Sequence, residues 1–165
     1  MIDLTAAVDA LVPYIVARRL ASQGLAVFPV RDRQPLTLRG VHSATSNLTI
    51  LAQMRWRKAD GCGLATGKVS GIDVLDVDVR ARTPEDREES PEDMYGECRN
   101  GFAALADLPA LPSTLCAQTP RNGRHFYFRH VVGGRNRKLC DGSVEWFSSG
   151  KLVVVPPAPG RTWLN

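Results

Sequence analysis

Hydrophobic residues near the start of the chain recur at intervals of three and four over residues 4–23, and Gly24 follows. This spacing predicts an amphipathic helix that ends at the glycine, with Pro13 either kinking the helix or marking its true start. The apolar run 25–30 comes next and is short, so it predicts a buried strand rather than a helix.

A second segment with helical spacing covers residues 48–58, where Asn47 or Thr49 is the expected N-cap. From Gly61 onward, short apolar runs alternate with glycine-bearing turns, which is typical of a sheet. The runs expected to form strands are residues 61–67, 72–79, 111–120, 125–130, 144–147 and 152–155. Between them, residues 94–108 have helical spacing, and the acidic stretch 84–91 is expected to be a mobile loop.

The 165 residues are enough for one domain with a real core, and 44 % of them are hydrophobic. We therefore expect a single domain over 1–165, with an N-terminal subdomain at 1–60 and a sheet subdomain at 61–165. No apolar run approaches the roughly 20 residues that a membrane helix needs, and the chain opens without a basic signal region. A cytoplasmic protein without a membrane partner is the expectation. The four cysteines lack metal-ligand spacing, so they are expected to be small buried residues.

Charge is distributed unevenly along the chain, although its net value is only +4. Seven lysines and arginines but only two acids lie within residues 121–151, whereas residues 85–93 are strongly acidic. A basic run of this kind fits a partner that carries phosphate, and it equally fits a solvated loop. Charge alone leaves both interpretations open.

The predicted strand that contains Asp76 and Asp78 alternates its two faces. Leu75, Val77 and Val79 form an apolar face, so the two aspartates project from the opposite face, about 7 Å apart along the backbone. Like charges at that separation repel unless a cation or open water relieves them. Carboxylate pairs of this kind suit Mg²⁺ or Mn²⁺, and the alternative is a pair of acids that face solvent at a strand end.

A second alternating strand contains His125, with Phe126 and Phe128 on the face opposite to it. If the phenylalanines join the core, His125 faces the same side as the aspartates. The turn before this strand contains Arg121, Gly123 and Arg124. Its glycine permits close backbone approach, and its arginines can fork onto phosphate oxygens.

A third acid, Glu145, lies between Val144 and Trp146 in another predicted strand. Three carboxylates beside a basic turn and a histidine are the groups that two-metal nucleotidyl transfer requires. Taken alone, a glutamate in the position of Glu145 is more often an exposed strand residue than a ligand.

The motifs together resemble the bifunctional DNA primase/polymerase N-terminal domain, called Prim-Pol, of the archaeo-eukaryotic primase superfamily. The segments that carry the resemblance are AVFPV, PLTLRGVHSATSN, GCGLATG, GIDVLDVDVR, LPSTLCAQTPRNGRHFYF and VEWFSSGKLVVVPPAPG. The resemblance implies that Asp76, Asp78 and Glu145 bind the catalytic metals and that His125 contacts the nucleotide phosphates. It departs from relatives at Arg121-Asn122-Gly123, which is commonly Ser-Gly-Gly, and at Glu145, where many relatives have aspartate.

The resemblance also implies an α/β (α+β) fold in which an RNA-recognition-like antiparallel sheet carries the acids. The implied activity is template-directed addition of (d)NTPs on single-stranded DNA, with two Mg²⁺ or Mn²⁺ ions and a helicase or helical domain fused or acting in trans. Further nucleotide-binding candidates are Arg121, Gly123, Arg124, Lys151, Thr66 and Gly67.

Three alternatives stay open: a nucleic-acid-binding module that has lost its chemistry, a metal-dependent nuclease, and a scaffold or interaction protein. A nuclease of this type uses a nucleophilic tyrosine or a pair of histidine ligands. Tyr127 is the candidate tyrosine, but the five-residue gap between His125 and His130 places these histidines on opposite strand faces.

Overall fold

The computed structural model describes residues 4–81, 98–106, 109–139 and 142–164. Its first part contains the helices α1 and α2 and most of the four-stranded sheet. The elements are α1 (Leu4–Ala21), β1 (Val27–Arg31), β2 (Gln34–Pro35), the 3-10 helix η1 (Gly40–Ser43), α2 (Leu48–Ala52), the 3-10 helix η2 (Trp56–Lys58) and β3 (Gly61–Ala65).

The second part is mostly strand. Its elements are β4 (Ile72–Val77), β5 (Val79–Ala81), β6 (Cys98–Asn100), α4 (Gly101–Leu105), β7 (Cys116–Gln118), β8 (Arg124–Arg129), β9 (Arg137–Leu139), β10 (Val144–Phe147), β11 (Leu152–Val155) and β12 (Thr162–Trp163). Among the described residues, no helix is both long enough and apolar enough to cross a membrane.

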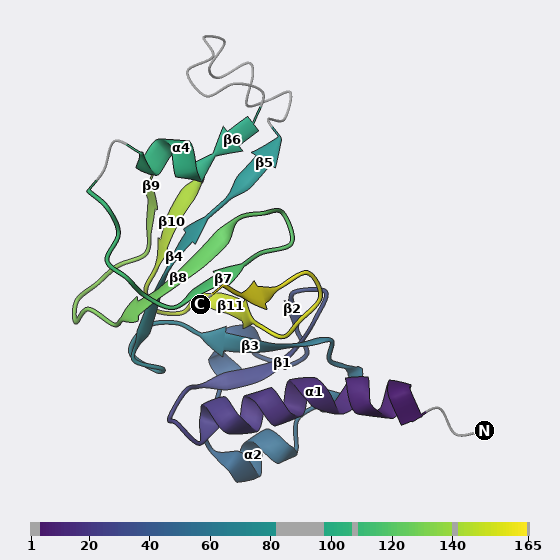
Figure 1. The fold of residues 1–165 in the computed structure, drawn as a ribbon. Helices are drawn as coiled ribbons and strands as arrows, with labels where there is room; N and C mark the ends of the chain where they lie inside the picture. The colour runs from purple at the N-terminus through teal and green to yellow at the C-terminus, as the bar shows by residue number, and fades with distance from the viewer. Residues whose placement is uncertain (1–3, 82–97, 107–108, 140–141, 165) are drawn as a thin grey trace.

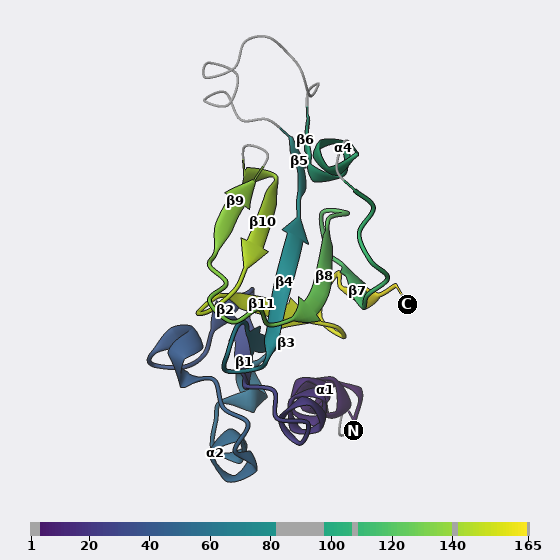
Figure 2. The ribbon, with the colours of Figure 1, turned by 90° about the vertical axis from the view of Figure 1, so that its left-hand side faces the viewer.

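The strands of the described residues form three antiparallel sheets. One has the order β11-β3-β1-β2, a second has the order β12-β7-β8-β4-β10-β9, and β5 pairs with β6. Figures 1 and 2 show α1 and α2 beside the four-stranded sheet at one end of the molecule, and α4 beyond the six-stranded sheet at the other. The predicted fold class is confirmed: the protein is mixed α+β, with mostly antiparallel sheets and few helices.

The main hydrophobic core joins α1 to both sheets. It contains Ala17 from α1, Leu64 from β3 and Val153 from β11, together with Val74 from β4 and Tyr127 from β8. Val74 and Tyr127 are paired across neighbouring strands, so their side chains project from the same face of the six-stranded sheet. They pack one end of that face against the rest of the core. The other end of the same face is free to carry polar residues.

The N-terminal helix and the first strand are confirmed, and Pro13 lies buried inside α1. Asn47 is the N-cap of α2, where its side-chain oxygen accepts hydrogen bonds from two backbone N–H groups. This helix ends at Ala52, earlier than predicted. Trp56 turns into the core, and its indole N–H donates to the Leu51 carbonyl at 2.7 Å, so the expected helix is divided there.

The prediction of a helix over residues 94–108 is confirmed for only part of its described residues. Cys98–Asn100 forms β6, and only Gly101–Leu105 is helical. Asn100 caps this helix, and a Cβ added at Gly101 would lie 2.5 Å from the Ser143 carbonyl, so the chain packs closely where strand changes to helix. Residues 94–97 and 107–108, and the acidic stretch 84–91, lie outside the described residues.

The sheets also divide the chain differently from the predicted sequence boundary near residue 60. Gly61–Ala65 was expected to open the sheet that carries the acids, but β3 pairs with β1 and β11 in the four-stranded sheet. Strands β2, β9 and β12 were not predicted, because they are two or three residues long. Of the cysteines, Cys62 and Cys116 are buried and free, as expected.

Candidate active site

Strand β4 carries Asp76 in the middle of the six-stranded sheet, between β8 and β10. The register places Asp76 directly opposite His125 on β8 and Glu145 on β10. Residues directly opposite each other in a sheet project from the same face. The three side chains therefore form one row across the sheet, and Lys138 on β9 extends it beyond Glu145.

The two faces of this sheet differ in character, as the alternation predicts. Leu75 and Val77 pack with Phe126 and Phe128 in a separate hydrophobic cluster, which confirms the predicted apolar face. The opposite face is not polar throughout, because Val74 belongs to the main core. The next pair on this face, Asp76 and His125, begins the polar row.

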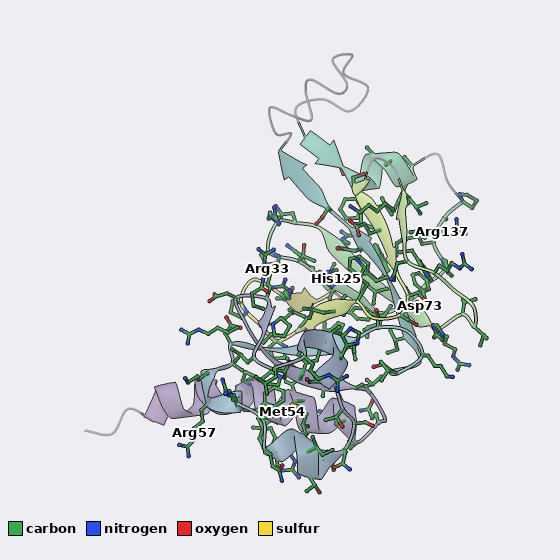
Figure 3. The ribbon with its side chains drawn as sticks, turned by 180° about the vertical axis from the view of Figure 1, so that it is seen from behind. Arg33, Met54, Arg57, Asp73, His125 and Arg137 are labelled. Carbon is green, nitrogen blue, oxygen red and sulfur yellow. The ribbon has the colours of Figure 1, made fainter. Side chains whose placement is uncertain are left out.

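A cavity of about 430 Å³ opens at this row. Asp76, Asp78 and His125 all line it, so the structure brings together both predicted aspartates and the predicted histidine. The other lining residues are Arg33, Thr119, Pro120, Arg121, Phe147, Leu152, Val153, Val154 and Arg161. These include residues of β11, so both large sheets contribute to its wall. Figure 3 shows His125 and Arg33 in this region of the molecule.

Several polar atoms around the cavity are buried without a hydrogen-bond partner. They include Asp76 Oδ1, His125 Nδ1 and Arg161 Nε. His125 Nε2 lies 3.4 Å from Asp76 Oδ1, which is longer than an ordinary N–H···O hydrogen bond. An unsatisfied buried polar atom costs about 1–3 kcal/mol. A ligand that contacts these atoms would offset this cost, as expected of a binding site.

The donor chemistry of the acids fits a divalent cation of the Mg²⁺ or Mn²⁺ type, which prefers carboxylate oxygens. Asp76 offers its unpartnered Oδ1, and Asp78 lines the same cavity. Glu145 is not among the residues that line the cavity, and its Oε1 lies 3.9 Å from Lys138 Nζ. Consequently, among the described side chains no group of three or more metal-binding residues is arranged around one point. A three-carboxylate site requires Glu145 to turn from Lys138 toward Asp76.

The turn before β8 places Arg121 at the cavity. The Thr119 N–H donates to the Gly123 carbonyl at 2.9 Å, and the Asn122 N–H donates to the Thr119 carbonyl at 3.1 Å. A Cβ added at Gly123 would lie 2.5 Å from the Val77 carbonyl oxygen. The close approach that Gly123 permits is thus toward the end of β4, next to Asp78.

Arg124 is on the other side of the sheet from the acids. Its guanidinium lies 5.1 Å from the centre of the Phe102 ring, over the cluster that contains Phe126. The same alternation that places His125 at the cavity directs Arg124 away from it. Its proposed grip on phosphate stays a prediction, and this conformation does not bring it to the acids.

Thr66 and Gly67 are also apart from the acids. Thr66 is fully buried, and its hydroxyl donates to the backbone carbonyls of Ser148 and Lys151. Gly67 has a φ of 86°, and a Cβ there would lie 2.4 Å from Ser149. Both residues thus hold the turn that leads to β11, and their nucleotide contacts stay predictions.

Lys151 contacts one of the residues that line the acid cavity. Its Nζ lies 5.2 Å from the centre of the Phe147 ring, and that ring lines the cavity. A cation over an aromatic face is held there by the charge distribution of the ring.

Two cavity residues, Arg33 and Arg161, were missed by the sequence analysis. Arg33 lies in the two-residue turn between β1 and β2, where Asp32 and Arg33 have φ values of 49° and 67°. Two-residue hairpin turns of this kind favour Asn-Gly or Asp-Gly, and because Arg33 stands where the glycine is usual, the hairpin was not predicted. Arg161 follows Gly160 near β12, and burial and the nearby Arg33 lower the pKa of its guanidinium.

The groups that a nuclease would use are not assembled. Tyr127 is 7 % exposed, packs 5.5 Å from the Trp163 ring, and has its pKa raised by burial. His130 Nδ1 lies 2.8 Å from Asp73 Oδ1, whereas His125 faces Asp76. The two histidines thus serve opposite faces of β4, as predicted.

Comparison with known families decides the class. A family model described as bifunctional DNA primase/polymerase, N-terminal, matches residues 17–165. The chain belongs to this family. The match covers the four-stranded and six-stranded sheets and every residue lining the cavity, so the cavity lies within a primase/polymerase-type domain. A comparison with curated proteins found no match.

Proposed function

We propose that the protein is a DNA primase/polymerase that adds nucleotides to a strand on a single-stranded DNA template by two-metal nucleotidyl transfer. The observation that carries this proposal is the position of Asp76, opposite His125 and Glu145 on neighbouring strands and in the same cavity as Asp78. The family match supports the same class of activity.

In this proposal Asp76, Asp78 and Glu145 hold two Mg²⁺ or Mn²⁺ ions. Such ions, when bound, activate the attacking 3′-hydroxyl and neutralise charge on the triphosphate. His125 is the group that contacts the nucleotide phosphates, because it lines the cavity beside Asp76 and its Nδ1 is buried without a hydrogen-bond partner. Arg121, exposed at the cavity wall, adds positive charge for the same phosphates.

The implied partners are the DNA template, nucleoside triphosphates, and a helicase or helical domain that is fused or acts in trans. The template strand carries one charge per nucleotide, so its binding is expected to weaken as the salt concentration rises. Binding of the template can be measured without nucleotide incorporation. Its salt dependence therefore tests the template contact independently of the reaction.

The test is incorporation of labelled nucleotides on a single-stranded template, with and without an annealed primer, in Mg²⁺ and in Mn²⁺. Asp76→Asn and Asp78→Asn keep the shape of the side chain and remove its charge, and incorporation is expected to fall by about a hundredfold or more. Arg57→Gln is the control, because it removes one exposed charge on η2, away from the cavity. Wild-type incorporation by Asp76→Asn would refute the proposal.

The primer decides the finer assignment. Products without a primer identify a primase, and products only with a primer identify a polymerase that extends existing strands. Template binding without incorporation in either metal would support a second candidate, a nucleic-acid-binding module of the same fold. The observation that favours this candidate is the Glu145 carboxylate, which lies 3.9 Å from Lys138 Nζ and does not line the cavity.

A further inference from the structure

Two arginines from distant parts of the sequence meet at the acid cavity. Arg33 comes from the β1–β2 turn of the four-stranded sheet, and Arg161 precedes β12 of the six-stranded sheet. Both also line an adjoining cavity of about 280 Å³, so they stand where the two cavities meet. Their position between the sheets makes them part of both walls.

The backbone holds Arg33 there in an unfavourable conformation. Asp32 and Arg33 both have positive φ, a region that residues with a Cβ rarely adopt. The turn is fixed by the Asp32 N–H, which donates to Asp60 Oδ2 at 2.8 Å. A strained turn that is pinned in place and carries an arginine into a cavity indicates that the arginine has a role there.

Arg161 is held in a different way, by burial. It is half-buried, its Nε is buried without a hydrogen-bond partner, and its Nη1 donates to the Pro159 carbonyl at 3.4 Å. Its backbone N–H closes a turn with the Ala158 carbonyl at 2.9 Å. Gly160 allows that turn to lie against Pro120, the residue before Arg121.

Neither guanidinium forms a salt bridge with any residue that the structure describes. Asp60 and Asp76 attract Arg161 without reaching salt-bridge distance, and Arg161 Nε stays unpartnered, so the two neighbouring guanidiniums keep donors for an anion. Guanidinium forks bind phosphate oxygens with two parallel hydrogen bonds. Because Arg121 lines the same cavity, the three arginines suit an anion with several phosphate groups better than a single carboxylate.

We propose that Arg33 and Arg161 form an oligophosphate subsite, which holds the polyphosphate tail of the nucleotide and the pyrophosphate that leaves. This inference rests on the proposed nucleotidyl transfer, since it gives the two arginines a part in that reaction. Their role is to bind and position the phosphates, while the carboxylates remain the metal ligands. Arg33 thereby makes the β1–β2 turn part of the nucleotide site.

The test measures binding of inorganic tripolyphosphate by calorimetry, in EDTA and at low salt, so that no metal takes part. Arg33→Gln and Arg161→Gln are each expected to bind about tenfold more weakly than the wild type, or worse. Arg57→Gln is the matched control, because Arg57 is exposed on η2 beside α1, away from the cavity (Figure 3), and it should bind normally. Asp76→Asn should bind more tightly, because it removes a repelling charge.

The same variants in the incorporation assay separate the two proposals. If the wild type incorporates nucleotides and both variants keep its KM for nucleotide and its tripolyphosphate affinity, the subsite is refuted while the polymerase function stands. If tripolyphosphate binds through the arginines but no nucleotide is incorporated, the subsite stands and the polymerase function fails. Arg33→Lys keeps the charge without the fork, so it should restore part of the affinity. Should Arg161→Gln not fold, the exposed Arg33 decides the question alone.

Discussion

Gly123→Ala adds one methyl group at the point where the turn that contains Arg121 touches the end of β4. The new Cβ would lie 2.5 Å from the Val77 carbonyl oxygen and 2.9 Å from Thr119 Oγ1, whereas ordinary contacts begin near 3.4 Å. The strand end or the turn must therefore move by roughly an ångström, because the nearest atom belongs to the backbone. Asp78 follows Val77 directly, so the displacement reaches a predicted metal ligand.

Two effects are expected from this displacement. Overpacking of this kind costs about 1–3 kcal/mol, which lowers the Tm of a chain of this size by about 3–10 °C. Misplacing a catalytic group by about 1 Å can reduce the rate by about a hundredfold. Calorimetry measures the first effect, and nucleotide incorporation, at a temperature where the variant is folded, measures the second.

Gly133→Ala provides the matched control. Gly133 has a φ of 78°, so alanine there is strained by about 1–2 kcal/mol, but its Cβ would meet no atom within 4 Å. The two variants should therefore lose similar stability, while only Gly123→Ala loses activity. Full activity and an unchanged Tm in Gly123→Ala would refute the inferred contact between turn and strand.

Three further predictions concern residues around the site. Asp73→Ala leaves the His130 ring and one backbone N–H without their buried acceptor, so urea unfolding should show a loss of about 3–5 kcal/mol. Burial raises the pKa of the Cys62 thiol from 9.0 to about 12, so mass spectrometry should find it unalkylated at pH 8 until the protein unfolds; rapid alkylation of the native protein would contradict this. Lys138→Ala breaks an exposed pair, so stability should change by less than about 1 kcal/mol, while the freed Glu145 should lower the Mn²⁺ concentration for half-maximal incorporation. An unchanged metal requirement would argue against Glu145 as a ligand.

Alternation along single strands was the most reliable guide to the site. It placed Asp76 and His125 on one face and Phe126 on the other, because one face of each strand must be buried. The cross-strand register, which sets His125 and Glu145 on either side of Asp76, could not be predicted, since it depends on which strands pair. The same alternation directs Arg124 to the face opposite the acids, beside Phe102. This was not predicted, because Arg124 was assigned to the turn before β8.

The turns that carry cavity residues were the segments predicted least well from the sequence. Arg33 lies in a hairpin without glycine or asparagine, and Arg161 lies in a short turn next to a two-residue strand. Neither segment has a hydrophobic period, so nothing local shows that both reach the acids. Their convergence follows from how the two sheets face each other, which is a property of the whole fold.

The strand order of the four-stranded sheet has a consequence for synthesis of the protein. β3 is complete at Ala65, but its neighbour β11 starts only at Leu152, and until then one edge of β3 has no partner. Arg161 emerges later still. On the ribosome, the nascent chain therefore cannot close the wall of the cavity until nearly all of the domain has been translated. Chains interrupted before β11 should be recognised by chaperones and proteases and should not compete for nucleotide or template.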